Sequence, residues 1–243
     1  MPQGSEHTVK AFDDDIGEVR ALVCEMGGLA EKAIGDAMHA LIRHDQETAT
    51  RVIEGDARID ELEIEIERQA VRLIALRAPM ADDLREAVAA MKIANVIERI
   101  GDYAKNIAKR VPVFDRHGDI EPLSILPSMA TIVSEMIHDV LDAFAARDAA
   151  KAAAVIDRDR AVDDFYNSVF RALLTFMMEN SHNISQSTHL LFIAKNLERV
   201  GDHATNVAEM VYFAATGEHL HDRETGNLPL TTDPEDDVEE PAT

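Results

Sequence analysis

The sequence predicts an all-α protein made of two consecutive units, each with three long antiparallel helices. The strongest observation is an internal repeat: the motif Glu-Arg-Ile/Val-Gly-Asp begins at Glu98 and again at Glu198, and the flanking residues match as well. A repeat of this length is typical of two copies of one structural unit. In addition, apolar residues recur every three or four positions in long segments joined by short turns, which is the pattern of amphipathic helices.

The first unit spans residues 12–117, after a polar N-terminal stretch, residues 1–11, that we expect to be frayed. Its first helix is predicted over 12–44. A second helix is predicted over 46–77, where an Ala-Pro-Met sequence interrupts the apolar pattern and the proline removes a helical hydrogen bond. The third helix, over 81–111, carries the first copy of the motif. Because the turns are short, successive helices should be antiparallel neighbours.

A segment with several prolines separates the two units, and the boundary is predicted near Gly118. The second unit, residues 118–216, repeats the helical pattern and carries the second copy of the motif in its last helix. Its helices are predicted over residues 127–147, 148–179 and 186–215, with a turn over 180–185.

Composition and charge disfavour several classes of protein. The net charge of −22 disfavours binding to nucleic acid or to anionic lipid. No apolar run approaches the ~18 residues of a membrane span, no signal peptide is recognisable, and Cys24 is the only cysteine. We therefore expect a cytoplasmic protein without direct membrane insertion. Residues 217–243 are rich in acidic residues and proline, which predicts a disordered acidic tail.

The motif points to carboxylate chemistry. Glu98, Asp102 and Asn106 are four residues apart, so they lie along one stripe of the third helix, nearly opposite its apolar residues. Gly101 belongs to a neighbouring line of small residues that would let a second helix approach closely. The stripe should therefore face a groove or the solvent rather than the core. The second copy repeats this stripe with Glu198, Asp202 and Asn206.

The helix that precedes each motif-bearing helix supplies further carboxylates. Residues at the same level of an antiparallel hairpin have numbers with a constant sum, and half of that sum falls in the turn. In both units, two aspartates four residues apart satisfy this rule with the motif carboxylates. The pairs that the rule brings level are Asp56 with Asp102, Asp60 with Glu98, Asp159 with Asp202, and Asp163 with Glu198.

Four carboxylates in one patch repel one another, and a bound cation would remove that repulsion. Carboxylate and amide oxygens suit Mg²⁺, Mn²⁺, Ca²⁺ or iron, and the sequence leaves the metal and the number of ions open. The alternative is a solvated acidic face whose charges pair with Arg99 or Arg199. The sequence contains no glycine-rich phosphate loop and no nucleophile motif, so we expect no enzymatic activity.

The residues around both copies resemble the repeated signature of the PhoU family of phosphate-specific transport accessory proteins. The resemblance rests mainly on residues 92–108 and 191–206. Shorter matches at residues 12–15 and 82–85 resemble the starts of the family's first and third helices. Together they cover about residues 12–217.

This resemblance implies two three-helix bundles related by pseudo-twofold symmetry. It also implies multinuclear metal clusters, of iron, zinc, manganese or magnesium, on the pairs Glu98/Asp102 and Glu198/Asp202. The implied function is negative regulation of the phosphate-starvation response and of phosphate uptake. The protein would act as an adaptor between the ATPase of the phosphate ABC transporter, PstB, and the membrane-bound sensor histidine kinase PhoR. These partners would hold it at the inner membrane.

Two points stay open at this stage. The protein could be a monomer or a homodimer. The alternative function is that of a metal-storage protein or of a carboxylate helical bundle of the di-iron type.

Overall fold

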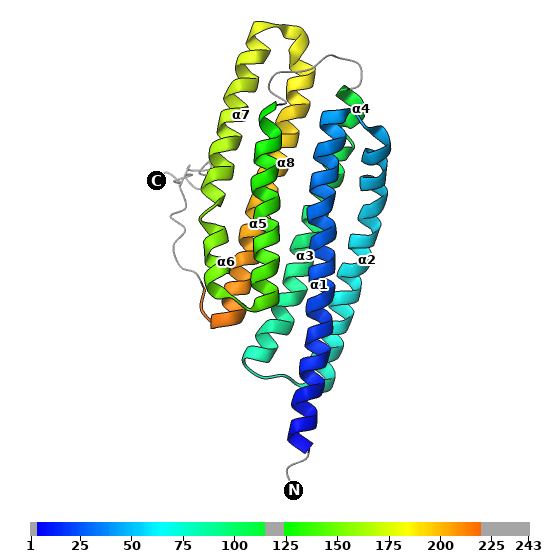
Figure 1. Ribbon diagram of the computed structural model, residues 1–243, viewed down its shortest axis with the longest axis vertical. Helices are drawn as coiled ribbons and strands as arrows, with labels where there is room; N and C mark the ends of the chain where they lie inside the picture. The colour runs from blue at the N-terminus through cyan, green and yellow to red at the C-terminus, as the bar shows by residue number, and fades with distance from the viewer. Residues whose placement is uncertain (1–3, 115–123, 220–243) are drawn as a thin grey trace, which may run out of the picture.

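The computed structural model describes residues 4–114 and 124–219, with side chains from Phe12 onward. The described chain is helical almost throughout, and its long helices run antiparallel to their sequence neighbours (Figure 1). The first unit contains α1 (Gly4–Arg43), α2 (Gln46–Arg77), α3 (Asp82–Ala108) and the short α4 (Val111–Phe114). The second contains α5 (Leu126–Ala146), α6 (Ala149–Ile156), α7 (Asp159–Glu179), the 3₁₀ turn η2 (Ser181–Asn183) and α8 (Ile184–Thr216).

Local signals in the sequence explain where several helices begin and end. Asp45 caps α2 by accepting a hydrogen bond from the backbone N–H of Thr48 at 3.0 Å, and Asp148 caps α6 in the same way from Lys151. The residue that ends α2, Ala78, has a left-handed conformation, and Pro79 follows it. Gly217 ends α8 with a φ of 77°, a conformation that glycine adopts without steric cost.

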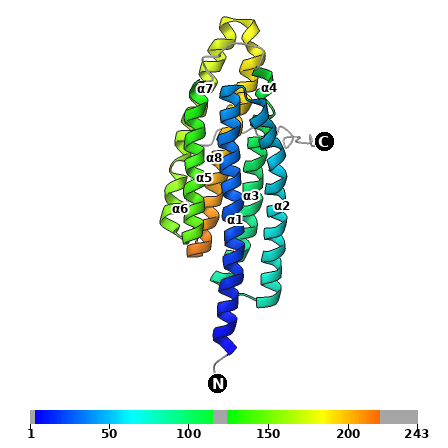
Figure 2. The same cartoon turned by 45° about the vertical axis from the view of Figure 1, so that its right-hand side comes forward.

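The two units lie side by side but staggered, so that the start of α1 and the tip of the α7–α8 hairpin project at opposite ends (Figure 1). Figures 1 and 2 show α5 beside α1, while α3 and α8 run antiparallel behind them and α2 and α7 lie at the two outer edges. The contacts between the units are therefore made by α1 with α5 and by α3 with α8. This arrangement leaves the α2–α3 and α7–α8 grooves, where the motif carboxylates were predicted, on opposite sides of the α3–α8 contact.

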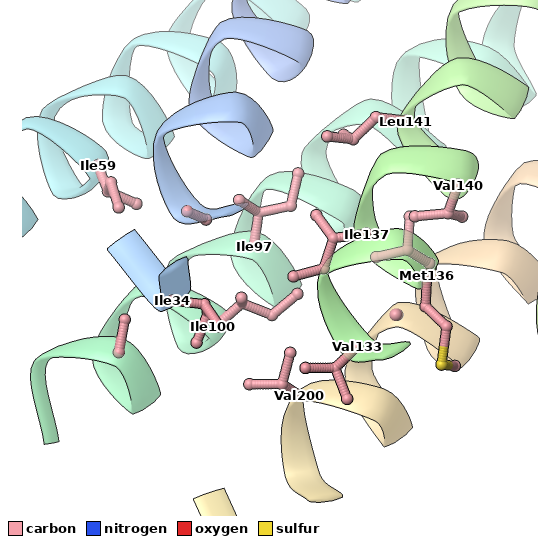
Figure 3. Packing of buried hydrophobic residues seen from close by; sticks show 14 of the residues in the cluster. Ile34, Ile59, Ile97, Ile100, Val133, Met136, Ile137, Val140, Leu141 and Val200 are labelled. Atoms are coloured by element: carbon pink, nitrogen blue, oxygen red, sulfur yellow. The ribbon is translucent and has the colours of Figure 1, made fainter. Parts of the chain in front are cut away.

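One hydrophobic core runs through both units. Ile97 and Ile100 of α3 belong to the same buried cluster as Val133 and Ile137 of α5 and Val200 of α8, and Figure 3 shows these side chains gathered between the helices. The core is built mainly from Ile, Val, Leu, Met and Ala, which suits the close packing of long helices. The two sequence repeats are thus two halves of one packed body.

Two of the predicted helices differ in the structure: one begins earlier than predicted and one is divided in two. The first helix begins at Gly4 instead of residue 12, because no proline follows Pro2 in this segment and a formed helix extends at little cost. The helix predicted over 148–179 is divided into α6 and α7 by a turn at Asp157 and Arg158. Arg158 pairs there with Asp139 of α5 at 2.8 Å, a tertiary contact that stabilises the interruption.

The third helix ends earlier than predicted. It stops at Ala108 rather than at Val111, and α4 follows after two turn residues. Pro112 explains the interruption because it cannot donate a hydrogen bond to the carbonyl of Ala108. The unit boundary predicted near Gly118, and the acidic tail from residue 220 onward, lie outside the described residues.

Gly27 of α1 lies where the two units approach each other closely. A Cβ atom at this position would lie 2.3 Å from Cδ2 of Leu141 on α5, whereas a Cβ at Gly28 meets nothing within 4 Å. We expect Gly27→Ala to lower the free energy of unfolding by about 1 kcal/mol, because Leu141 must leave its preferred rotamer. Gly28→Ala should instead raise it by about 0.5–1 kcal/mol through helix propensity. Urea denaturation followed by circular dichroism measures both changes, and two shifts of the same sign would contradict the close approach.

Candidate functional site

The first acidic cluster consists of Asp56 and Asp60 on α2 and Glu98 and Asp102 on α3. The α2 and α3 backbones approach closely because Gly101 has no side chain. A Cβ there would lie 2.9 Å from Cδ1 of Ile59 and 3.4 Å from Oδ1 of Asp56. Asp56 is buried, with 5% of its surface exposed, while Glu98 and Asp102 are half-buried. The groove thus brings together the carboxylates that the level rule paired.

A lysine neutralises part of this cluster. The ammonium group of Lys105 forms an ion pair with Asp56 and lies 3.6 Å from Oδ1 of Asp102, so it connects the two helices. The hydrogen bond to Asp56 raises the pKa of Lys105. Burial raises the pKa of Asp60 and of Glu98, and the surrounding carboxylates raise both values further. The cluster therefore carries more negative charge than one lysine offsets.

The second acidic cluster consists of Asp159 and Asp163 on α7 and Glu198 and Asp202 on α8. Gly201, like Gly101, lets the two helices approach closely, since a Cβ there would lie 3.1 Å from Cγ1 of Val162. Burial raises the pKa of Asp202 to about 6, with further contributions from Glu198, Asp159 and Asp163. Burial and the neighbouring carboxylates also raise the pKa of Asp163. These four groups form one electrostatically coupled set.

The two clusters differ in the lysine that neutralises them. Lys105 stands three residues after Asp102, but its counterpart in the second copy is Thr205, whose hydroxyl lies 3.3 Å from Oδ1 of Asp159. In the second cluster Lys195, three residues before Glu198, forms the ion pair, at 2.5 Å. The repeated motif therefore has two different internal counter-ions.

The donor atoms suit a hard cation, although the lysines hold the position of the counter-ion in this structure. One oxygen of Glu198, Oε2, is buried and has no hydrogen-bond partner, so the second cluster contains an acceptor without a donor. Among residues 4–114 and 124–219, no three Asp, Glu, His or Cys side chains are already gathered as a metal-ligand set. Metal binding would therefore require the carboxylates to converge and the lysines to move away.

Other candidates from the sequence lie elsewhere. Asn106 is exposed, and Asn206 lines a groove with Arg85 and Phe213 at the other side of α8. Lysines, rather than Arg99 and Arg199, pair with the cluster carboxylates in the part of the chain that the structure describes.

The Glu-x-x-His spacing that di-iron bundles use does occur in this chain, away from both clusters. Glu135 and His138 line a groove between α1 and α5. Glu179 and His182 are exposed at the tip of the α7–α8 hairpin. The spacing therefore adds no histidine to either acidic cluster.

Sequence reasoning missed a contact between the two motif copies. Tyr103 and His203, which occupy equivalent positions, pack edge to face with ring centroids 5.3 Å apart, and the Tyr103 hydroxyl lies 3.5 Å from Nε2 of His203. The guanidinium carbon of Arg199 lies 6.0 Å from the centre of the Tyr103 ring. Burial lowers the pKa of His203, and the charges of Arg99 and Arg199 lower it further. The one signal in the sequence for this contact is that Tyr103 and His203 occupy equivalent positions in the two motif copies.

Comparison with known proteins agrees with this arrangement of paired motifs. The sequence profile of the PhoU domain matches residues 23–111 and 126–211, one match on each unit. The chain belongs to the PhoU family. A PhoU homolog from Zymomonas mobilis is 58% identical over 235 residues, which cover 96% of this chain and 99% of the relative. A PhoU homolog from Caulobacter vibrioides is 49% identical over 220 residues, 89% of this chain and 94% of the relative.

Solved PhoU structures share the fold. The crystal structure of PhoU from Pseudomonas aeruginosa matches with a TM-score of 0.82 at 36% identity, over 85% of this chain and 100% of the other. PhoU from Streptococcus pneumoniae matches with a TM-score of 0.80 at 29% identity, over 86% and 99% of the two chains. These matches confirm the prediction of two tandem three-helix bundles.

The family assignment also fixes the general class of function. The Zymomonas and Caulobacter relatives are both named phosphate-specific transport system accessory proteins, a regulatory class rather than a class of enzymes. This PhoU-family chain accordingly has a non-enzymatic accessory role in phosphate transport. Within the described residues, no helix has both the length and the apolar character needed to cross a bilayer.

Proposed function

We propose that this chain is a negative regulator of the phosphate-starvation response and of phosphate uptake. It acts as an adaptor that contacts the transporter ATPase PstB and the sensor histidine kinase PhoR. The two acidic clusters bind metal ions in this proposal and so fix the surface that the partners recognise. The accessory role in phosphate transport follows from the family, and the proposal adds the two partners and the metal ions to it.

The observation that carries this proposal is the pair of matched acidic grooves. Each is formed by the motif-bearing helix and the helix before it, and each gathers four carboxylates around a glycine that lets the helices approach. Burial and mutual repulsion raise the pKa values of several of these groups, which is the electrostatic penalty that a cation would relieve. In a fully solvated acidic face, Asp56 would not be buried nor Asp202 half-buried.

The metal ions would connect helices rather than take part in a reaction. Asp56, Asp60, Glu98 and Asp102 would hold ions in the first groove, and Asp159, Asp163, Glu198 and Asp202 would hold them in the second. An oxygen-rich site of this kind suits Mg²⁺ or Mn²⁺, and iron or zinc also accept carboxylate ligands. The ions supply charge neutralisation, which lets both helices of each hairpin keep one relative position.

A capture experiment tests the adaptor role and its dependence on the clusters. The wild-type protein is immobilised, with and without about 1 mM Mn²⁺, and PstB and PhoR are offered separately. We expect capture of both partners, at least about threefold stronger with the metal, and loss of that difference in the double variant Asp102→Asn/Asp202→Asn. Binding of metal with equal capture throughout would favour a metal-storage protein over an adaptor.

A further inference from the structure

A line of basic residues follows the contact between α3 and α8, between the two acidic clusters. Arg85, Lys92 and Arg99 are seven residues apart on α3, so they share one face of that helix. Arg199 joins them from α8, across the ring of Tyr103. We call these four residues the basic seam. Of these four residues, only Arg85 forms an ion pair within the described part of the chain, with Asp82 at 2.7 Å. The other three have no described carboxylate within salt-bridge distance.

Unpaired basic residues in one line need explanation in a chain of net charge −22. The two acidic clusters lie in the neighbouring grooves, and their carboxylates form ion pairs with Lys105 and Lys195 instead. Three of its four residues therefore offer cationic groups without a carboxylate partner, which favours an anionic occupant of the basic seam.

The lower end of the seam is an apolar groove. Val88 and Ala89 of α3 and Met210 and Phe213 of α8 line it, with a volume of about 350 Å³. Val88 is 37% exposed there. Arg85, Lys92 and Glu209 are the charged residues of its lining, and Glu209 already has a partner of its own. The groove thus suits a chain segment with a few apolar side chains followed by acidic ones.

The end of the described chain points into this groove. Gly217, with its φ of 77°, turns the chain after α8, and the guanidinium group of Arg85 packs against it, 3.2 Å from where a Cβ would be. Two residues later the ring of His219 stacks on Phe213, with centroids 4.4 Å apart and an interplanar angle of 12°. The first contact joins the end of α8 to α3, and the second holds His219 against α8 at the groove. His219, the last described residue, therefore lies in the lining of the groove, at one end of the basic seam.

The sequence that follows has the composition that the seam would bind. Residues 220–243 contain Leu220, Leu228 and Leu230 and then the acidic run 235–240, Glu-Asp-Asp-Val-Glu-Glu. The distance along α3 from Arg85 to Arg99 is about 21 Å at 1.5 Å per residue. The chain from His219 to Glu235 can span up to about 55 Å when extended, so the acidic run reaches the pair Arg99 and Arg199 without strain.

We propose that residues 220–243 bind along the basic seam of the same molecule, with the acidic run 235–240 on Arg99 and Arg199. Because the tail is covalently attached, its effective concentration at the seam is in the millimolar range, and a few exposed ion pairs suffice for binding. The bound tail covers the surface between the two acidic clusters. It thereby competes with any acidic partner segment for the same arginines, which makes it an autoinhibitory element.

Paramagnetic relaxation measurements on the full chain test this proposal. A nitroxide label is attached at Val238→Cys in a Cys24→Ala background, and the amide signals of α3 and α8 are recorded in ¹⁵N-labelled protein. At about 50 mM salt we expect the signals around Arg99 and Arg199 to lose at least about half of their intensity. Most of this intensity should return at about 0.5 M salt, where the charges are screened.

Two variants with the same change of net charge separate the seam from general electrostatics. Arg99→Gln/Arg199→Gln should abolish the selective broadening, while Arg72→Gln/Arg171→Gln, at exposed positions on α2 and α7, should leave it unchanged. Equal broadening in both variants, or none in the parent protein, would overturn the proposal. A mixed sample provides the last control: spin-labelled protein at natural nitrogen abundance is added to ¹⁵N-labelled protein that carries no spin label. Broadening in this mixture would also overturn the proposal, since the tail would then bind a second copy.

Discussion

Asp202→Asn is expected to stabilise the metal-free protein by about 1–2 kcal/mol at about pH 7.5, and to weaken its binding of divalent cations by at least about tenfold. The stabilisation arises because burial, Glu198 and the two aspartates of α7 oppose the charge of Asp202. Asparagine keeps the size of the side chain and removes the charge. Loss of a ligand and of a negative charge explains the weaker metal binding.

The pH dependence has a defined sign. The pKa of Asp202 is about 6 in the folded protein and 3.8 in the unfolded chain, so the native state binds this proton more tightly. Its contribution to stability is therefore favourable at low pH, falls as the pH rises from about 4 to about 6, and is fully lost above pH 6. The shift corresponds to at most about 3 kcal/mol, and solvent screening of a half-buried group reduces it to about 1–2 kcal/mol.

Urea denaturation in the presence of a chelator, at about pH 5 and about pH 7.5, measures this difference. Asp202→Asn should gain about twice as much stability at the higher pH as at the lower, because about half of the penalty is already present at about pH 5. Asp164→Asn makes the same chemical change on the exposed side of α7 and should shift stability by less than about 0.5 kcal/mol. Isothermal titration with Mn²⁺ then compares metal binding by the same proteins. Equal stability of wild type and Asp202→Asn at both pH values would contradict the electrostatic penalty.

Glu86→Ala is expected to lower the free energy of unfolding by about 2–3 kcal/mol. Glu86 of α3 is buried, with 8% of its side chain exposed, and it pairs with Arg20 of α1 and with Arg147, which follows α5. The Nε of Arg20 donates to Oε1 of Glu86 at 3.0 Å. Removal of the carboxylate leaves two cations close together without their partner. Because the Arg147 side chain is 52% exposed, water compensates part of the loss.

The ion pair between Lys32 and Asp36 provides the control, since both residues lie on α1 and their side chains are 69% and 40% exposed. Asp36→Asn should change the free energy of unfolding by no more than about 0.5 kcal/mol. Urea denaturation followed by circular dichroism compares the two variants at neutral pH. If Glu86→Ala and Asp36→Asn cost the same, the buried pair between the units contributes nothing beyond a surface contact.

The helical scaffold could be predicted well because its signals are local. The apolar period and the caps define α2 as Gln46–Arg77, the range predicted from the sequence. The division between α6 and α7 could not be predicted in this way. It depends on the contact of Arg158 with Asp139, which the sequence places in separate helices. A break that tertiary contacts stabilise leaves little trace in the periodicity.

The acidic clusters show the same distinction. Asp56 and Asp102 could be paired from the sequence because position along an antiparallel hairpin is nearly linear in residue number. The choice of Lys105 and Lys195 as counter-ions could not be foreseen, because it depends on rotamers and on differences between the two copies. The contact of Tyr103 with His203 depends on how the units pack, which no local pattern specifies.

The continuous core has a consequence for how the molecule responds to binding. Residues of α3, α5 and α8 share one cluster, so opening either repeat exposes apolar surface of the other, and we expect the two repeats to unfold together. A ligand that binds only the α2–α3 hairpin therefore slows the hydrogen exchange of slowly exchanging amides in α5 and α8 as well, because those amides exchange through the same global opening. We therefore expect the duplicated sequence to unfold as a single thermodynamic unit, so that a ligand bound to one half also slows exchange in the other.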